Sequence, residues 1–179
     1  MRVCLLLVVS ATVCCWGQEK GIEPDWDIRP VLKDIAAHAQ RLNTVLDQID
    51  PQAMIQKGAP ETYAAQLNES KVQAKALATE TLDLANSPEK LSADLHTYFR
   101  MQSLEMILGS IEEGIRKYQN PALADLLRSQ MAENGPSRER FQKYIVELAA
   151  EHEQEYQVMD HEAQRCRGTL ARQPKSEKK

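Results

Sequence analysis

Apolar residues recur at alternating steps of three and four along most of this chain, and this spacing constrains the fold more than any other feature. It is clearest in the first segment, where the positions are Ile28, Leu32, Ile35, Ala39, Leu42, Leu46 and Ile49. Steps of three and four return to one side of an α-helix, so these side chains form a single stripe. We therefore expect a helix that packs this stripe against a partner helix.

Two central segments repeat the rhythm with different side chains. The second segment has smaller and more polar contacts, at Tyr63, Leu67, Ser70, Ala74, Leu77, Thr81 and Leu84. The third has Leu91, Leu95 and Phe99, and then Met101, Leu104, Leu108, Ile111 and Ile115. Its stripe shifts around the helix near residue 100, which predicts different neighbours at its two ends. Gly109 and Gly114 lie inside it, and each either permits close helix approach or is a tolerated weak position.

The last segment is the longest, from Pro136 to about residue 171. Its predicted inward positions are Phe141, Ile145, Leu148, His152, Tyr156, Met159, Ala163, Cys166 and Leu170. At about 1.5 Å per residue this helix is on the order of 50 Å long.

Prolines mark the starts of these helices. The chain has eight prolines, and those at expected helix starts are Pro30, Pro51, Pro60, Pro88, Pro121 and Pro136. Proline suits the first helical turn because its missing N–H has no partner there and its φ is already helical. No alternating pattern of useful length predicts a strand.

The expected fold is all-α. Short connections force neighbouring helices to run antiparallel, which predicts an up-down bundle of about four long helices with one or two short extra helices. One interpretation of the short segment after Pro121 is a continuation of the third helix beyond a bend. A single domain over residues 26–171 would follow a linker at 18–25 and precede a disordered basic tail at 172–179.

Residues 1–17 have the pattern of a secretory signal peptide. Arg2 precedes a short apolar run, and a small residue, Gly17, stands where the chain turns polar. We expect cleavage between Gly17 and Gln18, and export to a periplasm or the extracellular space. The run is too short for a membrane span, so no transmembrane helix is expected after cleavage. Lipid attachment at Cys14 or Cys15 is an alternative, although neither cysteine follows the usual small residue.

Removal of residues 1–17 would leave Cys166 as the sole cysteine. An internal disulfide is then excluded, and the fold must be held by helix packing alone. Two interpretations of Cys166 stay open. It is either a small apolar residue on the inward face of the last helix or the site of an intermolecular disulfide in a homodimer.

Charge and motifs argue against most kinds of chemistry. The formal net charge of the whole chain is −4, with no strong basic patch, so nucleic-acid binding is not expected. The sequence has no Glu-x-x-His, His-Glu-x-x-His, phosphate-binding loop or nucleophile elbow. The weak candidates for a metal or haem site are His152, His38 and Met159, which are too few for a full ligand set. We therefore predict no resident cofactor and no catalytic residues.

Two functional hypotheses remain. The first is an exported, non-enzymatic protein that binds or scaffolds a protein or another component of the cell envelope through long amphipathic helices. The second is a bundle that holds a metal, haem or small apolar molecule between its helices near His152.

Overall fold

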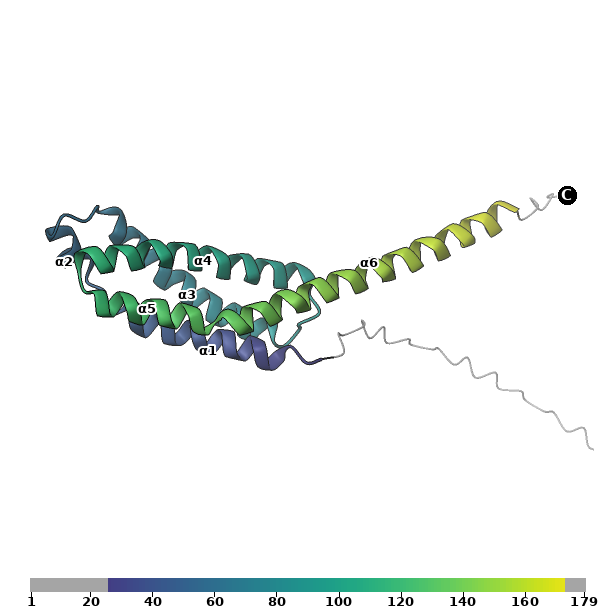
Figure 1. The fold of residues 1–179 in the computed structure, drawn as a ribbon. Coiled ribbons are helices and arrows are strands. Elements are labelled where there is room, and N and C mark those ends of the chain that lie inside the picture. Colours follow the sequence, from purple (N-terminus) through teal and green to yellow (C-terminus); the bar gives the residue numbers. More distant parts are fainter. Residues whose placement is uncertain (1–25, 173–179) are drawn as a thin grey trace, which may run out of the picture.

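The computed structural model describes residues 26–172, and the helices there are α1 (Arg29–Leu46), α2 (Pro51–Gln56), α3 (Thr62–Leu84), α4 (Leu91–Tyr118), α5 (Pro121–Glu133) and α6 (Gly135–Arg172). No strand occurs in this part of the chain, and the long helices pack side by side (Figure 1). The predicted all-α bundle is thus confirmed. The predicted signal peptide, its cleavage point, the linker and nearly all of the predicted tail lie outside the described residues.

The long helices occupy four positions around the core, and helices at successive positions run in opposite directions (Figure 1). α1 packs on α3, α3 on α4, and α4 on α5. The fourth position is shared, because α6 begins where α5 ends and runs on toward the same end of the bundle, with a bend between the two helices (Figure 1). Both α5 and α6 contact α1, so the ring of helices closes around one core.

The turn before α5 corrects one expectation, because α5 folds back along α4 instead of continuing it (Figure 1). Asn120 is extended, with φ −150° and ψ 116°, and its side chain accepts a hydrogen bond from the Ala122 backbone N–H at 2.9 Å. Pro121 then occupies the first helical turn. An asparagine cap followed by proline starts a new helix, which reverses the chain here.

The stripes predicted for the first two segments are confirmed. All seven predicted positions of the first segment are buried, and Leu32, Ile35, Ala39 and Leu46 are completely so. In α3 the polar members are satisfied within their own helix. The Ser70 hydroxyl donates to the Gln66 carbonyl oxygen at 2.9 Å, and the Thr81 hydroxyl donates to that of Leu77 at 2.6 Å. These polar residues can therefore face the core without an unpaired group.

The first turns of α4 correct the predicted stripe of the third segment. Leu95 and Phe99 are 37% and 59% exposed, whereas Asp94 and Thr97 are buried. The inward face of α4 is Asp94, Thr97, Met101, Leu104, Leu108, Ile111 and Ile115. It keeps the three–four spacing without a shift, and its first two members are polar.

The two glycines within α4 differ in their surroundings. A Cβ added to Gly114 would lie 2.5 Å from Cε1 of the Tyr63 ring, whereas one added to Gly109 would meet nothing within 4 Å. Gly114 therefore permits a close approach of Tyr63 to α4, and Gly109 is a tolerated weak position.

This difference predicts opposite effects of the same substitution. Gly114→Ala should lower the free energy of unfolding by about 1–3 kcal/mol, because the Tyr63 ring must move. Gly109→Ala should raise it by up to about 1 kcal/mol through better helix propensity. Urea denaturation of the two variants measures both effects, and equal effects at the two positions would contradict the assignment.

α6 changes character half-way along its length. Phe141, Ile145 and Leu148 are buried as predicted, but Tyr156 and Met159 are 67% and 62% exposed. From residue 152 to residue 169 every side chain except that of Glu155 is exposed. The predicted inward face is therefore wrong from His152 to Cys166, since the helix extends past the end of the bundle (Figure 1), and the side chain of Leu170 lies outside what the structure describes.

Polar contacts fix the part of α6 that lies within the bundle. The Tyr144 hydroxyl donates to the carbonyl oxygen of Pro88, in the α3–α4 loop, at 2.8 Å. The Trp26 indole N–H donates to Glu147 at 2.8 Å, and its ring meets that of Tyr144 edge-on at 5.8 Å. Hydrogen bonds therefore join α6, at the point where it leaves the bundle, to the α3–α4 loop and to Trp26, which precedes α1. Within residues 26–172, no helix is long and apolar enough to cross a membrane.

Candidate functional site

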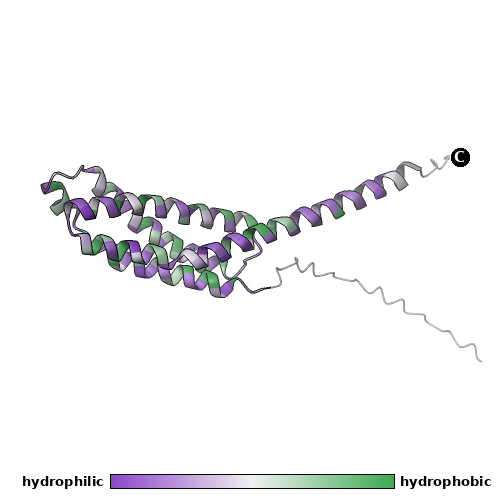
Figure 2. Ribbon diagram, in the orientation of Figure 1, coloured by the Kyte–Doolittle hydropathy of each residue, from purple (hydrophilic) through white to green (hydrophobic). Residues whose placement is uncertain are grey.

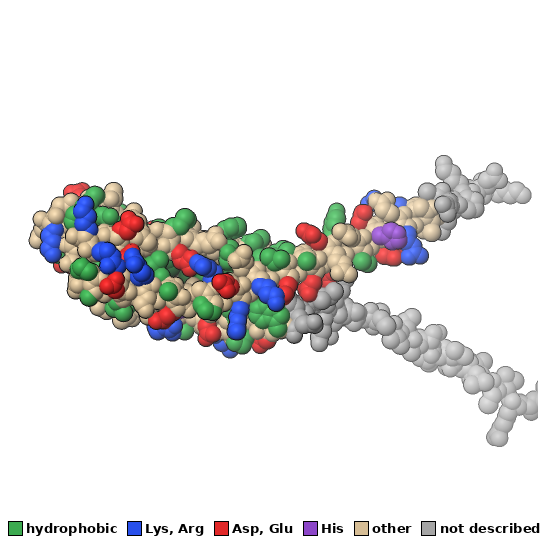
Figure 3. Space-filling view, in the orientation of Figure 1, with side chains coloured by type: hydrophobic (Ala, Val, Ile, Leu, Met, Phe, Trp, Pro, Cys, Tyr) green, Lys and Arg blue, Asp and Glu red, His purple; other side chains and the backbone are tan. Residues whose placement is uncertain are grey.

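The most unusual surface of the molecule is the part of α6 outside the bundle, residues 152–172, which we call the arm. It extends about 30 Å at 1.5 Å per residue. The arm stands clear of the bundle (Figure 3), and its ribbon is mostly hydrophilic (Figure 2). Its exposed residues include one stripe at steps of three and four, which consists of Tyr156, Met159, Ala163 and Cys166. An isolated helix of this length is only marginally stable in water, and exposed apolar patches often mark interaction surfaces.

Charge is distributed unevenly along the arm and the residues leading into it. No Lys or Arg occurs from residue 144 to residue 164, while the acidic residues there are Glu147, Glu151, Glu153, Glu155, Asp160 and Glu162. Arg165 and Arg167 follow. Arg165 donates to Glu162 on the same helix at 3.0 Å. The arm is thus acidic at its base and basic toward its end.

A shallow groove lies where the arm leaves the bundle. It is lined by Leu91, Ala149, His152, Glu153, Tyr156 and Gln157. The start of α4 supplies one wall and α6 supplies the other. The groove is open and its lining surface is mainly apolar, which suits a macromolecular surface better than an enclosed small ligand.

The residues predicted as weak metal or haem candidates are not brought together. His38 is buried on α1, and its ring Nε2 donates to the backbone carbonyl oxygen of Gln130 on α5. His152 and Met159 are exposed on the arm. Within the described residues, no group of three or more His, Cys, Asp or Glu side chains could hold a metal ion. Cys166 is exposed, so the interpretation of its thiol as a core residue is wrong, and the intermolecular disulfide stays a prediction.

Asp94 is the group that sequence reasoning missed. Its side chain is fully buried, and neither carboxylate oxygen has a hydrogen-bond partner among the described residues. Burial, together with the nearby charge of Glu89, raises the pKa of Asp94 to about 7. A signal was present in the sequence: the three–four spacing, extended back from Met101, falls on Thr97 and Asp94. The Asp94 carboxyl is therefore buried because Asp94 lies on the inward face of α4.

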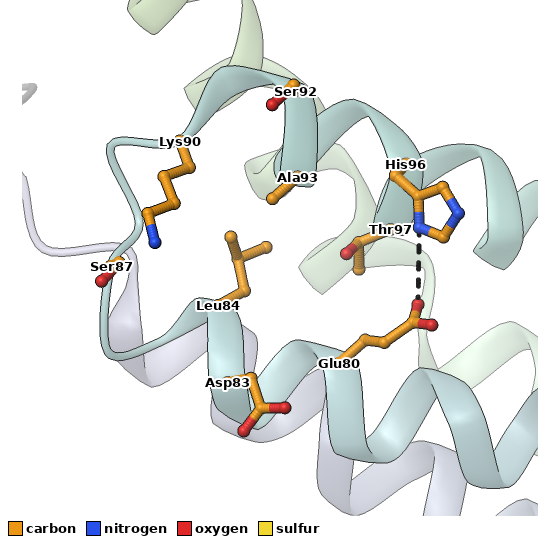
Figure 4. A pocket seen from close by; sticks show the side chains of 9 residues that line it. All are labelled: Glu80, Asp83, Leu84, Ser87, Lys90, Ser92, Ala93, His96 and Thr97. Atoms are coloured by element: carbon orange, nitrogen blue, oxygen red, sulfur yellow. Dashed lines mark ion pairs between the residues drawn. The ribbon is translucent and has the colours of Figure 1, made fainter.

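A polar groove lies beside the turn between α3 and α4 (Figure 4). Glu80 projects toward it from α3, and two basic side chains of α4 approach its carboxylate. Arg100 Nε donates to Glu80 at 2.8 Å, and His96 Nδ1 lies 3.6 Å from the same oxygen. Because the acidic group is already paired across the α3–α4 interface, the arrangement is suited to joining the two helices.

A second charged cluster joins α4 to α5. Glu112 is buried and accepts hydrogen bonds from Arg116 at 2.7 Å and from Arg128 at 3.0 Å. Arg116 also donates to Asp125 at 2.6 Å. Burial works to raise the pKa of Glu112, but the hydrogen bonds and charges of the two arginines outweigh it and lower that pKa overall. This network holds the helical hairpin together and presents no unpaired nucleophile or base.

Comparison of the chain with protein-family models, with curated proteins and with solved structures found no match. The function is therefore inferred from the geometry of the molecule itself.

Proposed function

We propose that this chain is an exported, non-enzymatic scaffolding or binding protein of the cell envelope, and that the arm is its contact element. The observation that carries the proposal is the exposed stripe Tyr156, Met159, Ala163 and Cys166 on a helix that extends beyond its own bundle. A bundle that fixes the base of a long helix and leaves the remainder uncovered presents a groove-filling or helix-pairing surface.

The charged clusters support a structural role for the rest of the molecule. Glu80 is paired with Arg100, and Glu112 is paired with Arg116 and Arg128. Both clusters connect neighbouring helices of the bundle. The alternative function, a ligand held between helices near His152, gains no support, because His152 lies on the exposed arm.

Two measurements test this proposal. Fractionation of cells that produce the full chain should place it outside the cytosol, with residues 1–17 removed. Chemical crosslinking of tagged chain in isolated envelopes should give a defined adduct, either with another envelope component or with an untagged copy of the chain. Met159→Glu should abolish the adduct, because it places a charge in the apolar stripe.

Val158→Glu is the matched control. Val158 is adjacent in sequence and 58% exposed, but it lies on a different side of the helix from the stripe. Retention of the protein in the cytosol, or adducts that are equal for the wild type and Met159→Glu, would refute the proposed function.

A further inference from the structure

We propose that the arm pairs with the arm of a second copy of this chain, in an antiparallel two-helix coiled coil. This inference rests on the proposed function and names the partner. It follows from three features: the direction in which the stripe faces, the spacing of its residues, and the change of charge along the arm.

The direction of the stripe requires the antiparallel orientation. Cys166 follows Leu148 by about five helical turns of 3.6 residues, so the two side chains point to the same side of α6. Leu148 is buried against its own bundle, which means that the exposed stripe continues the bundle-facing side of the helix. A partner helix packed on the stripe therefore lies beyond the end of the bundle and in line with it. In a parallel pair, the N-terminal part of the partner's α6 would collide with this bundle. In an antiparallel pair, only the C-terminal end of the partner's α6 comes near it.

The spacing of the stripe specifies the pairing. Tyr156, Met159, Ala163 and Cys166 alternate steps of three and four, which is the seam of a left-handed coiled coil. In an antiparallel pair centred near residue 161, Tyr156 packs against Cys166 of the other copy, and Met159 packs against Ala163. Each layer combines a large side chain with a small one, so the helices can approach closely.

The charges favour the same arrangement. In this register Arg167 of each copy lies next to Glu153 of the other, near the base of the arm. Arg165 lies on the same acidic section, which includes Glu151 and Glu155. In a parallel pair the acidic sections would instead lie side by side over their full length, and like charges at that separation repel. Reversing one copy therefore places the basic end of each arm beside the acidic base of the other, and only Asp160 and Glu162, near the centre, face like charges.

The first test measures the oligomeric state of the purified full chain, cleaved or uncleaved, under reducing conditions. Analytical ultracentrifugation over a range of concentrations should show a monomer–dimer equilibrium. Met159→Glu should raise the dissociation constant at least about tenfold, because a carboxylate would be buried in the seam. The matched control, Val158→Glu, should leave it unchanged. Circular dichroism and the urea midpoint verify that both variants keep the bundle.

The second test determines the orientation by crosslinking. In the antiparallel pair the two Cys166 thiols lie about 15 Å apart along the axis. Mild oxidation of the wild type should therefore give no covalent dimer, which opposes the intermolecular-disulfide interpretation of Cys166. Tyr156→Cys should give a covalent dimer joined between residues 156 and 166, identified by mass spectrometry. Val158→Cys reports the background of random collisions.

The outcomes separate this inference from the proposed function. A monomer at all concentrations, or a Cys166–Cys166 disulfide in the oxidised wild type, overturns the antiparallel pair. If the monomer still forms a stripe-dependent adduct with a different envelope component, the proposed function stands and only the inference fails. If Met159→Glu changes neither the oligomeric state nor the adduct, both fail.

Discussion

Asp94→Asn is expected to stabilise the protein at pH 8 by up to about 4 kcal/mol and to have little effect at pH 4. The wild-type carboxyl, with its pKa raised to about 7 from an ordinary 3.8, keeps its proton in the folded state over a range where the unfolded chain has released it. The folded state therefore binds more protons between about pH 4 and pH 7, and wild-type stability falls as the pH rises through that range. A shift of about three pKa units corresponds to about 4 kcal/mol.

The measurement is the difference in unfolding free energy between wild type and variant, obtained by urea denaturation at several pH values. The asparagine side chain has nearly the same shape but does not ionise, so the difference isolates the charge. Asp83→Asn is the control, because Asp83 is exposed near the end of α3. A benefit of Asp94→Asn that is equal at pH 4 and pH 8 would show that ionisation of Asp94 is not what destabilises the core.

Phe141→Ala should lower the free energy of unfolding by about 3–5 kcal/mol, as expected for removal of a fully buried aromatic ring. Phe141 lies on the part of α6 inside the bundle, with the Tyr98 ring centre 6.3 Å away. Val158→Ala, on the arm of the same helix, should change stability by no more than about 0.5 kcal/mol. Comparable losses at the two positions would mean that the arm is packed against the bundle in solution.

Thermal and urea unfolding of both variants, followed by circular dichroism, provide the comparison. The protein concentration should be low enough to keep the chain monomeric, so that self-association does not add to the stability of the arm. Together the two variants show how much of α6 unfolds cooperatively with the bundle.

Much of the fold could be predicted because helix identity depends on local periodicity. The stripe from Ile28 to Ile49 was identified completely, since apolar side chains at steps of three and four can be buried only on one helix face. The start of α4 was predicted wrongly. The spacing back from Met101 falls on Thr97 and Asp94, but the apolar residues Leu95 and Phe99 were assigned to the buried face in their place, and the packing of α4 on its neighbours buries Asp94 and Thr97.

The candidate site was predicted only in part. The sequence located the stripe of Tyr156, Met159 and Cys166. The same spacing occurs on a helix whose apolar side is buried in its own bundle and on a helix whose apolar side is exposed. Periodicity specifies which side of a helix is apolar, and it contains no information on what covers that side. The arm is uncovered because the neighbouring helices end before it, which depends on the lengths of other segments.

The sequence by itself determined the helices, their approximate limits and the apolar faces of the first two segments, because these depend mainly on local spacing. Proline lies in the first turn of α1, α2, α5 and α6 as predicted, whereas Pro60 and Pro88 lie before α3 and α4. Only the tertiary structure decided that α5 folds back on α4, that Gly114 faces Tyr63 and that α6 extends beyond the bundle. It also decided that Asp94 is buried with no hydrogen-bond partner among residues 26–172. Each of these depends on which distant residues lie nearby. The pairing of helices in space sets those neighbours, and local sequence does not.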